Sequence, residues 1–281
     1  MSNFSKVMLA TDFSESSGRL GACLFELCPD TATEVVLVHV LDDDEDADPH
    51  SSSYQAAWCK LKKCETELKQ AGYEALTLVM PKGEPFAEIN RIASEEAITL
   101  AFLASHGKGF IRSTLLGSTT FDLARKANYP LFIEKLYKET EKNVPLLTRV
   151  MVPTDFSKES LVALNILREL REELGEVVFV HVVEKSRDSD ELTEQLQQAE
   201  SKLNELVEEL KNFGVTATIR VTKGTPSKRL QRIAGEMDAT LIIMAKTGAG
   251  PVKGLMMGST AQNVALNSNR PILLLPLDDE N

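Results

Sequence analysis

Short runs of β-branched and other apolar residues alternate along the chain with longer segments in which apolar residues recur at helical spacing. This alternation is typical of βα units and predicts a parallel sheet. The strands are expected at 6–11, 34–40, 75–80, 99–104, 130–136, 148–153, 176–182, 215–221, 239–245 and 271–277. The helices are expected at 14–28, 52–71, 84–96, 117–127, 157–174, 188–213, 225–236 and 258–268, with Ser14 and Ser157 as N-caps.

The second half of the chain repeats the first. LATDFSES (9–16) matches VPTDFSKES (152–160), VVLVHV (35–40) matches VVFVHV (177–182), and PKGEPFAEINRIASE (81–95) matches TKGTPSKRLQRIAGE (222–236), at an offset of 141 to 143 residues. We therefore predict an α/β protein with two tandem doubly wound parallel sheets, each five-stranded with order 3-2-1-4-5. The domains would span 1–137 and 148–281, joined by a polar linker at 138–147.

Two features in each half point to a ligand site. Asp12 and Asp155 follow the first strands, and a glycine-containing loop follows each fourth strand. The loops begin at Gly107 and Gly248 and close on Gly117-Ser118-Thr119 and Gly258-Ser259-Thr260. Because strands 1 and 4 are neighbours in the predicted order, both features would meet in one crevice at the carboxyl ends of the strands.

These residue types suit a nucleotide. Unpaired N–H groups at a helix start attract phosphate, glycine lets the backbone approach it, and the hydroxyls of Ser118 and Ser259 add donors. The carboxylate of Asp12 or Asp155 can accept hydrogen bonds from ribose hydroxyls or a base amine. Cations in the loops are further candidates for neutralising phosphate: Lys108, Arg112, Lys246 and Lys253. Each feature alone is common turn or capping chemistry, but their joint repetition favours function.

Other known motifs do not fit. Neither loop is a Walker A sequence, and the spacing of Gly248, Gly250 and Gly254 is not that of a dinucleotide fingerprint. His106 matches Thr247 in the repeat and has no carboxylate near it in sequence, which argues against catalysis. His39 and His181 occupy matching places near the ends of second strands, where a packing or hydrogen-bonding role is expected.

Composition narrows the class of protein. A net charge of -11 and a pI near 5.0 argue against broad nucleic-acid or anionic-membrane binding, and no segment has the length of a membrane helix or a secretory signal. A cytoplasmic location is therefore expected. The cysteines, Cys23, Cys28, Cys59 and Cys64, are expected to be structural thiols, with redox sensing at Cys59 or Cys64 as an alternative.

The motifs resemble the universal stress protein family in its tandem form, over nearly the whole chain. Nucleotide-binding members carry Gly-x-x-Gly, nine further residues, and then Gly followed by Ser or Thr. Gly107 with Gly117-Ser118, and Gly248 with Gly258-Ser259, match the second and third elements. Ala104 and Ala245 replace the first glycine, which adds a methyl where the family has none.

This resemblance implies particular contacts. A Pro-Thr-Asp turn touches the nucleotide, which corresponds to Pro153-Thr154-Asp155 and, with Ala10 in place of proline, to Thr11-Asp12. Main-chain groups of Val40 and Val182 would contact adenine. The implied ligand is ATP or AMP, with magnesium on the phosphates. Pairing of the last strands would give an internal pseudo-dimer, and a homodimer of whole chains stays open.

Three functions compete at this point. The first is a stress-related regulatory module that binds adenine nucleotide in one or both halves and acts on an unidentified protein partner. The second is a slow ATPase, for which the sequence offers no convincing base. The third is a nucleotide-free scaffold, which the two alanine replacements favour.

Overall fold

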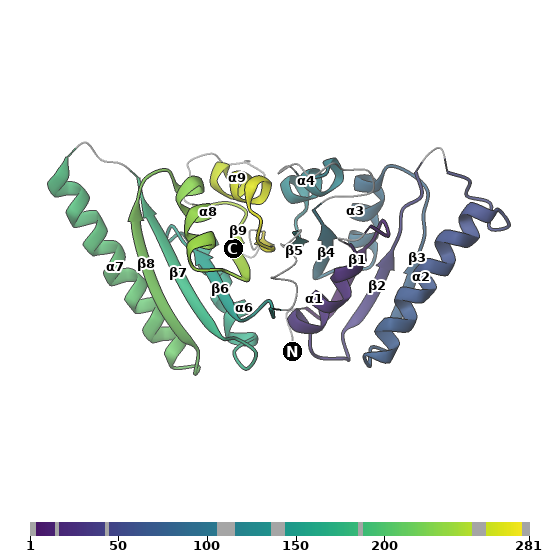
Figure 1. Cartoon of the computed structure of the whole chain (residues 1–281), viewed down its shortest axis with the longest axis horizontal. Coiled ribbons are helices and arrows are strands. Elements are labelled where there is room, and N and C mark those ends of the chain that lie inside the picture. Colours follow the sequence, from purple (N-terminus) through teal and green to yellow (C-terminus); the bar gives the residue numbers. More distant parts are fainter. Residues whose placement is uncertain are drawn as a thin grey trace. The chain divides into compact units, whose positions relative to one another are not determined.

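The computed structural model describes residues 4–14, 17–42, 45–105, 116–135, 144–184, 188–248 and 257–276 (Figure 1). The chain divides into two compact units. The first comprises residues 1–123 and 129–134, and the second comprises 124–128 and 135–281.

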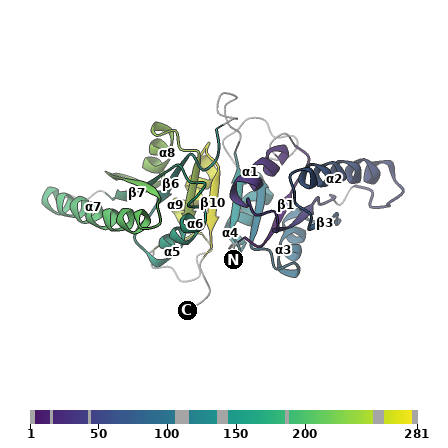
Figure 2. The same cartoon turned by 90° about the horizontal axis from the view of Figure 1, so that it is seen from below.

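The first unit is a doubly wound α/β structure. Its strands are β1 (Lys6–Ala10), β2 (Glu34–Val38), β3 (Leu76–Val79), β4 (Leu100–Ala104) and β5 (Leu131–Glu134), all parallel in the order β3-β2-β1-β4-β5. The helices are η1 (Ser17–Arg19, a 3-10 turn), α1 (Leu20–Leu27), α2 (Ser52–Gln70), α3 (Pro85–Glu95) and α4 (Ser118–Lys126), of which residues 118–123 belong to this unit. Figure 2 shows α1 and α2 on one face of this sheet and α3 and α4 on the other, as right-handed crossovers require.

The second unit repeats this topology. Its strands are β6 (Arg149–Pro153), β7 (Glu176–Val183), β8 (Thr216–Lys223), β9 (Leu241–Ala245) and β10 (Ile272–Leu275), parallel in the order β10-β9-β6-β7-β8. The helices are α5 (Lys158–Leu161), α6 (Ala163–Glu169), α7 (Ser189–Lys211), α8 (Pro226–Glu236) and α9 (Ser259–Asn267). Both units therefore confirm the predicted strand order 3-2-1-4-5.

The core of each unit lies along its central strands. Val7 and Met8 of β1, like Val150 and Met151 of β6, have no exposed surface, because helices cover both faces of a parallel sheet. The edge strand β8 instead alternates exposed and half-buried residues. Among the described residues, no helix has both the length and the apolar character needed to cross a membrane.

Two helices differ from the sequence prediction. The helix expected over 14–28 starts at Leu20, after the 3-10 turn, and Ser14 caps that turn by accepting the Ser17 N–H at 3.3 Å. The helix expected over 157–174 is divided into α5 and α6 at Val162, whose N–H bonds to Glu159 three residues back. It ends at Glu169, and the following residues form a turn closed by a Glu173-to-Leu170 bond. Short i→i+3 bonds at these places tighten the chain beyond what helical periodicity reveals.

Candidate functional site

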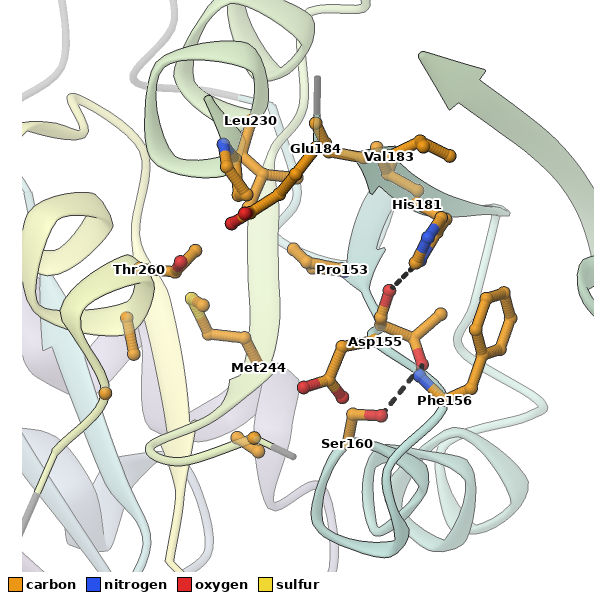
Figure 3. A pocket seen from close by; sticks show the side chains of 18 of the residues that line it. Pro153, Asp155, Phe156, Ser160, His181, Val183, Glu184, Leu230, Met244 and Thr260 are labelled. Atoms are coloured by element: carbon orange, nitrogen blue, oxygen red, sulfur yellow. Dashed lines mark hydrogen bonds between the residues drawn. The ribbon is translucent and has the colours of Figure 1, made fainter. Parts of the chain in front are cut away.

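A pocket of about 730 Å³ lies in the second unit, at the carboxyl ends of β6, β7 and β9 (Figure 3). The turn after β6, the end of β7, the loop after β9 and the start of α9 all contribute to its wall. The turn, strand-end and glycine-loop residues that the sequence predicted for this half line it: Pro153, Thr154, Asp155, Val182, Gly248, Gly258, Ser259 and Thr260. They meet because β6 and β9 are neighbours at the point where the strand order reverses.

The turn after β6 holds the Asp155 side chain in place. The Thr154 hydroxyl accepts the Phe156 N–H at 3.0 Å, and Asp155 Oδ1 accepts the Ser157 N–H at 3.0 Å. Ser157 then caps α5 by accepting the Ser160 N–H. Phe156 has a φ of 63°, a left-handed conformation that a bulky residue rarely adopts. The turn is therefore bent sharply and fixed by three side chains.

The first unit contains the same turn. Thr11 accepts the Phe13 N–H at 3.0 Å, Asp12 Oδ1 accepts the Ser14 N–H at 3.0 Å, and Phe13 has a φ of 61°. Val40 lies just beyond the end of β2. Gly117 precedes α4, and Ser118 and Thr119 open it. The remaining predicted residue of this half, Gly107, lies outside the described residues, as do His106, Lys108 and Arg112.

Gly248 lies directly against the carboxylate of Asp155. A Cβ built on this glycine would lie 2.1 Å from Asp155 Oδ2, far closer than Cβ contacts in real structures. Neither Gly117, Gly248 nor Gly258 has a positive φ. Position 248 therefore needs a glycine because the backbone there lies so close to the Asp155 carboxylate, and not because the backbone is left-handed.

The start of α9 presents uncapped amides to the pocket. Gly258 is the N-cap, in an extended conformation, and has no side chain to accept a helical N–H. Its own N–H donates to the Lys246 carbonyl at 2.7 Å, which fixes the loop end against β9. Ser259, Thr260 and Ala261 follow and line the pocket. Helix starts of this kind carry partial positive charge and bind anions.

Apolar side chains also line the pocket. Pro153, Leu230 of α8 and Met244 of β9 line the pocket (Figure 3). Val182 of β7 lines it as well. A flat heterocyclic base suits such surroundings, whereas phosphate does not. The pocket thus combines apolar side chains with a helix start that attracts anions.

The alanines that replace the family's first glycine fit regular strand geometry. Ala104 and Ala245 are the last residues of β4 and β9, paired with Glu134 and Leu275. Neither has a positive φ. The backbone therefore accepts alanine without conformational strain, and the Ala245 methyl contributes to the pocket wall.

Lys246 does not have the role expected from the sequence. Its side chain is 2% exposed, and its amine donates to the Ala127 carbonyl within the second unit. Burial lowers the pKa of this amine to about 8. The amine is thus held by a carbonyl and is not directed at a phosphate. Lys253, the other cation predicted for this loop, lies outside the described residues.

The sequence prediction missed the contribution of α7. Gln195, Gln198 and Lys202 line the pocket from this helix, at spacings of three and four residues. The signal was a polar stripe beside the buried Ala199 and Leu203 on the same helix. Only the fold reveals that this stripe reaches the pocket.

The described residues include no group of three or more His, Cys, Asp or Glu side chains placed to hold a metal ion. The thiols of Cys23 and Cys28 are buried, and burial raises the pKa of Cys28 to about 12. Burial also raises the pKa of the Cys64 thiol. These shifts disfavour the reactive thiolate at Cys28 and Cys64.

Comparison with known proteins identifies the family. The model of the Universal stress protein family matches residues 3–135 and 147–276. Universal stress protein MJ0577 of Methanocaldococcus jannaschii is 26% identical over 155 residues, covering 47% of this chain and 95% of the relative. Universal stress protein MJ0531 of the same organism is 29% identical over 143 residues, covering 46% of this chain and 82% of the relative.

A solved structure matches both halves at once. The crystal structure of a universal stress protein from Archaeoglobus fulgidus shares 25% identity and a TM-score of 0.73, covering 97% of this chain and 98% of that one. The two family matches together span most of the sequence, one in each half. The chain therefore belongs to the universal stress protein family and carries two of its domains in tandem.

Proposed function

We propose that the pocket of the second half binds an adenine nucleotide, ATP or AMP, and that the chain is a regulatory protein whose state depends on that nucleotide. The observation that carries the proposal is one pocket that joins Asp155 to the uncapped start of α9 across the switch point between β6 and β9. Binding proteins need no nucleophile or base, whereas an ATPase does. The proposal therefore assigns the pocket to binding.

In this proposal each end of the nucleotide has its own partner. The phosphates lie at the start of α9, where N–H groups and the hydroxyls of Ser259 and Thr260 donate to them. The ribose hydroxyls donate to Asp155. The base lies between Leu230 and Met244, with main-chain groups of Val182 at its edge.

A magnesium ion would be held mainly by the phosphates. Magnesium commonly binds through one or two carboxylates together with phosphate oxygens and water. The pocket offers the carboxylates of Asp155 and Glu184 and the hydroxyl of Ser259 as candidates beside the phosphates. This donor set fits a metal that arrives with the nucleotide.

We extend the proposal to the first half through Thr11, Asp12, Val40, Gly117, Ser118 and Thr119. The turn after β1 has the same hydrogen bonds and the same left-handed phenylalanine as the turn after β6. Occupancy of one or both halves would then alter how the chain engages a protein partner. The family name supplies the link to stress, and the partner is unidentified.

Denaturing the purified protein and separating the supernatant by anion-exchange chromatography identifies any bound nucleotide and gives its amount per chain. Calorimetric titration with ATP and AMP then gives the affinity for each nucleotide.

The deciding variant is Ser259→Pro, in a background where Gly117→Val blocks the first half. Proline is tolerated at the first helical position, and the extended Gly258 before it is compatible with proline, so α9 should persist while one phosphate-binding N–H is lost.

We expect Ser259→Pro to weaken ATP binding by about tenfold or more, since a hydrogen bond to a charged group contributes about 1.5–3 kcal/mol. Ser259→Ala is the matched control, because it removes the hydroxyl and keeps the N–H. Equal affinity in the proline and alanine variants would contradict the placement of phosphate at this helix. A protein that carries no nucleotide and ignores added ATP and AMP would favour the scaffold hypothesis instead.

A further inference from the structure

A column of three side chains supports the peptide group that precedes Asp155. Lys202 of α7 places its Nζ 5.1 Å from the centroid of the Phe156 ring. The Phe156 ring stacks on His181 of β7, with centroids 4.5 Å apart and an interplanar angle of 29°. His181 Nδ1 lies 2.8 Å from the carbonyl oxygen of Thr154 (Figure 3). The column thus ends on the residue immediately before Asp155.

The first unit builds the same column from the matching residues of the repeat, at offsets of 142 or 143 residues. Lys60 Nζ lies 5.4 Å from the Phe13 centroid, and Phe13 and His39 have centroids 4.2 Å apart. His39 Nδ1 lies 2.8 Å from the Thr11 carbonyl oxygen. The two units therefore share one set of contacts beside the aspartate.

The hydrogen-bond partner of His181 decides which ring nitrogen carries a proton. A carbonyl oxygen only accepts hydrogen bonds, so Nδ1 of His181 must carry a proton and donate it to Thr154. This bond sets the plane of the Thr154–Asp155 peptide. The Cα of Asp155 lies in this peptide plane and carries the side chain. The direction of the Asp155 carboxylate into the pocket therefore depends on the plane.

The phenylalanine makes the arrangement costly. A left-handed conformation costs a non-glycine residue about 1–2 kcal/mol, and Phe156 and Phe13 both adopt it. Such strain persists only where surrounding contacts determine it, and it gathers at functional sites. In both units the strained residue follows the aspartate, and its ring covers the histidine that holds the aspartate's peptide.

We propose that His181 and Phe156 are positioning residues for Asp155: they aim its carboxylate across the pocket at Gly248, where it meets the ribose. The inference rests on the proposed nucleotide site, and it adds what holds that site in order. His181 acts through the Thr154 carbonyl and does not itself contact the nucleotide. Lys202 fixes the ring that covers it.

The test compares His181→Leu with His181→Asn in the full chain carrying Gly117→Val. Leucine keeps bulk and removes the donor, whereas asparagine restores an N–H close to the position of Nδ1. ATP affinity is measured by calorimetry on folded protein. In parallel, the carboxyl ¹³C resonance of Asp155, assigned with Asp155→Asn, reports the surroundings of the carboxylate without nucleotide. His39→Leu is the control, since it removes the equivalent contacts beside Asp12.

We expect His181→Leu to weaken ATP binding by about tenfold or more and to shift the Asp155 resonance. His181→Asn should restore affinity to within about threefold, and His39→Leu should leave both readouts unchanged. A merely structural histidine would lower stability in both variants and leave the affinity of the folded protein alone, which would overturn the inference. An asparagine variant as weak as the leucine variant would also overturn it. If the parent binds no nucleotide, the proposed function fails, and the Asp155 resonance alone decides the positioning role.

Discussion

Gly248→Ala provides a direct test of the contact between the glycine loop and Asp155. The added Cβ would lie 2.1 Å from Asp155 Oδ2, whereas real Cβ contacts essentially never fall below 3.0 Å. The carboxylate must therefore move by about 0.9 Å or more, the difference between these two distances. A ribose hydroxyl bonded at about 2.7 Å would then be beyond normal hydrogen-bond range. The loss corresponds to about 1.5–3 kcal/mol, or about 10- to 150-fold in Kd.

The cause is isolated by a double-mutant cycle with Asp155→Ala. Both single variants and the double variant should bind ATP with similar, weakened affinity, because the alanine at 248 has no carboxylate to displace once Asp155 is gone. Calorimetric titration in the Gly117→Val background gives the four dissociation constants. Gly235→Ala is the control, since a methyl there meets no atom within 4 Å. Additive losses, or wild-type affinity in Gly248→Ala, would refute the reasoning.

Two further predictions concern stability. Gly175→Ala places a Cβ 2.3 Å from the backbone oxygen of Thr148, so urea denaturation should show that the free energy of unfolding falls by about 1–3 kcal/mol. Gly235→Ala should show no such loss. Equal urea midpoints for the two variants would contradict this prediction. Burial lowers the pKa of Lys246 from 10.5 to about 8, so the unfolded state binds more protons between these pH values and the free energy of unfolding rises with pH there. Lys246→Met removes this pH dependence. The stability of the variant relative to wild type should therefore be greatest below pH 8 and decline toward pH 10.5. Parallel curves of unfolding free energy against pH for the two proteins would contradict the lowered pKa of Lys246.

Much of the architecture follows from local patterns. Buried strands and amphipathic helices leave different periodicities, and their alternation limits each half to a parallel sheet with right-handed crossovers. The repeat then places Asp155 and Gly258 at the carboxyl ends of neighbouring strands, and the structure confirms the strand order that brings them together. The division of the second half's first helix at Val162 was not predicted, because it depends on a few i→i+3 bonds that leave no periodic pattern in the sequence.

Other features depend on contacts that no local pattern contains. Lys246 is a loop cation in sequence, but its amine lies in a buried site and bonds to Ala127, far away along the chain. Gln195 and Gln198 look like ordinary solvated residues of a helix, and only the packing of α7 brings them to the pocket. The left-handed Phe156 violates the usual preference of bulky residues, so propensity alone would predict another conformation.

The sequence by itself determined the repeat, the two parallel sheets and the residues at their carboxyl ends, because periodicity and turn chemistry are local properties written along the chain. Only the tertiary structure decided the close approach of Gly248 to Asp155 and the column of Lys202, Phe156 and His181 behind it. These contacts join residues that lie dozens of positions apart. Their geometry arises from the packing of strands and helices together, which no single segment specifies.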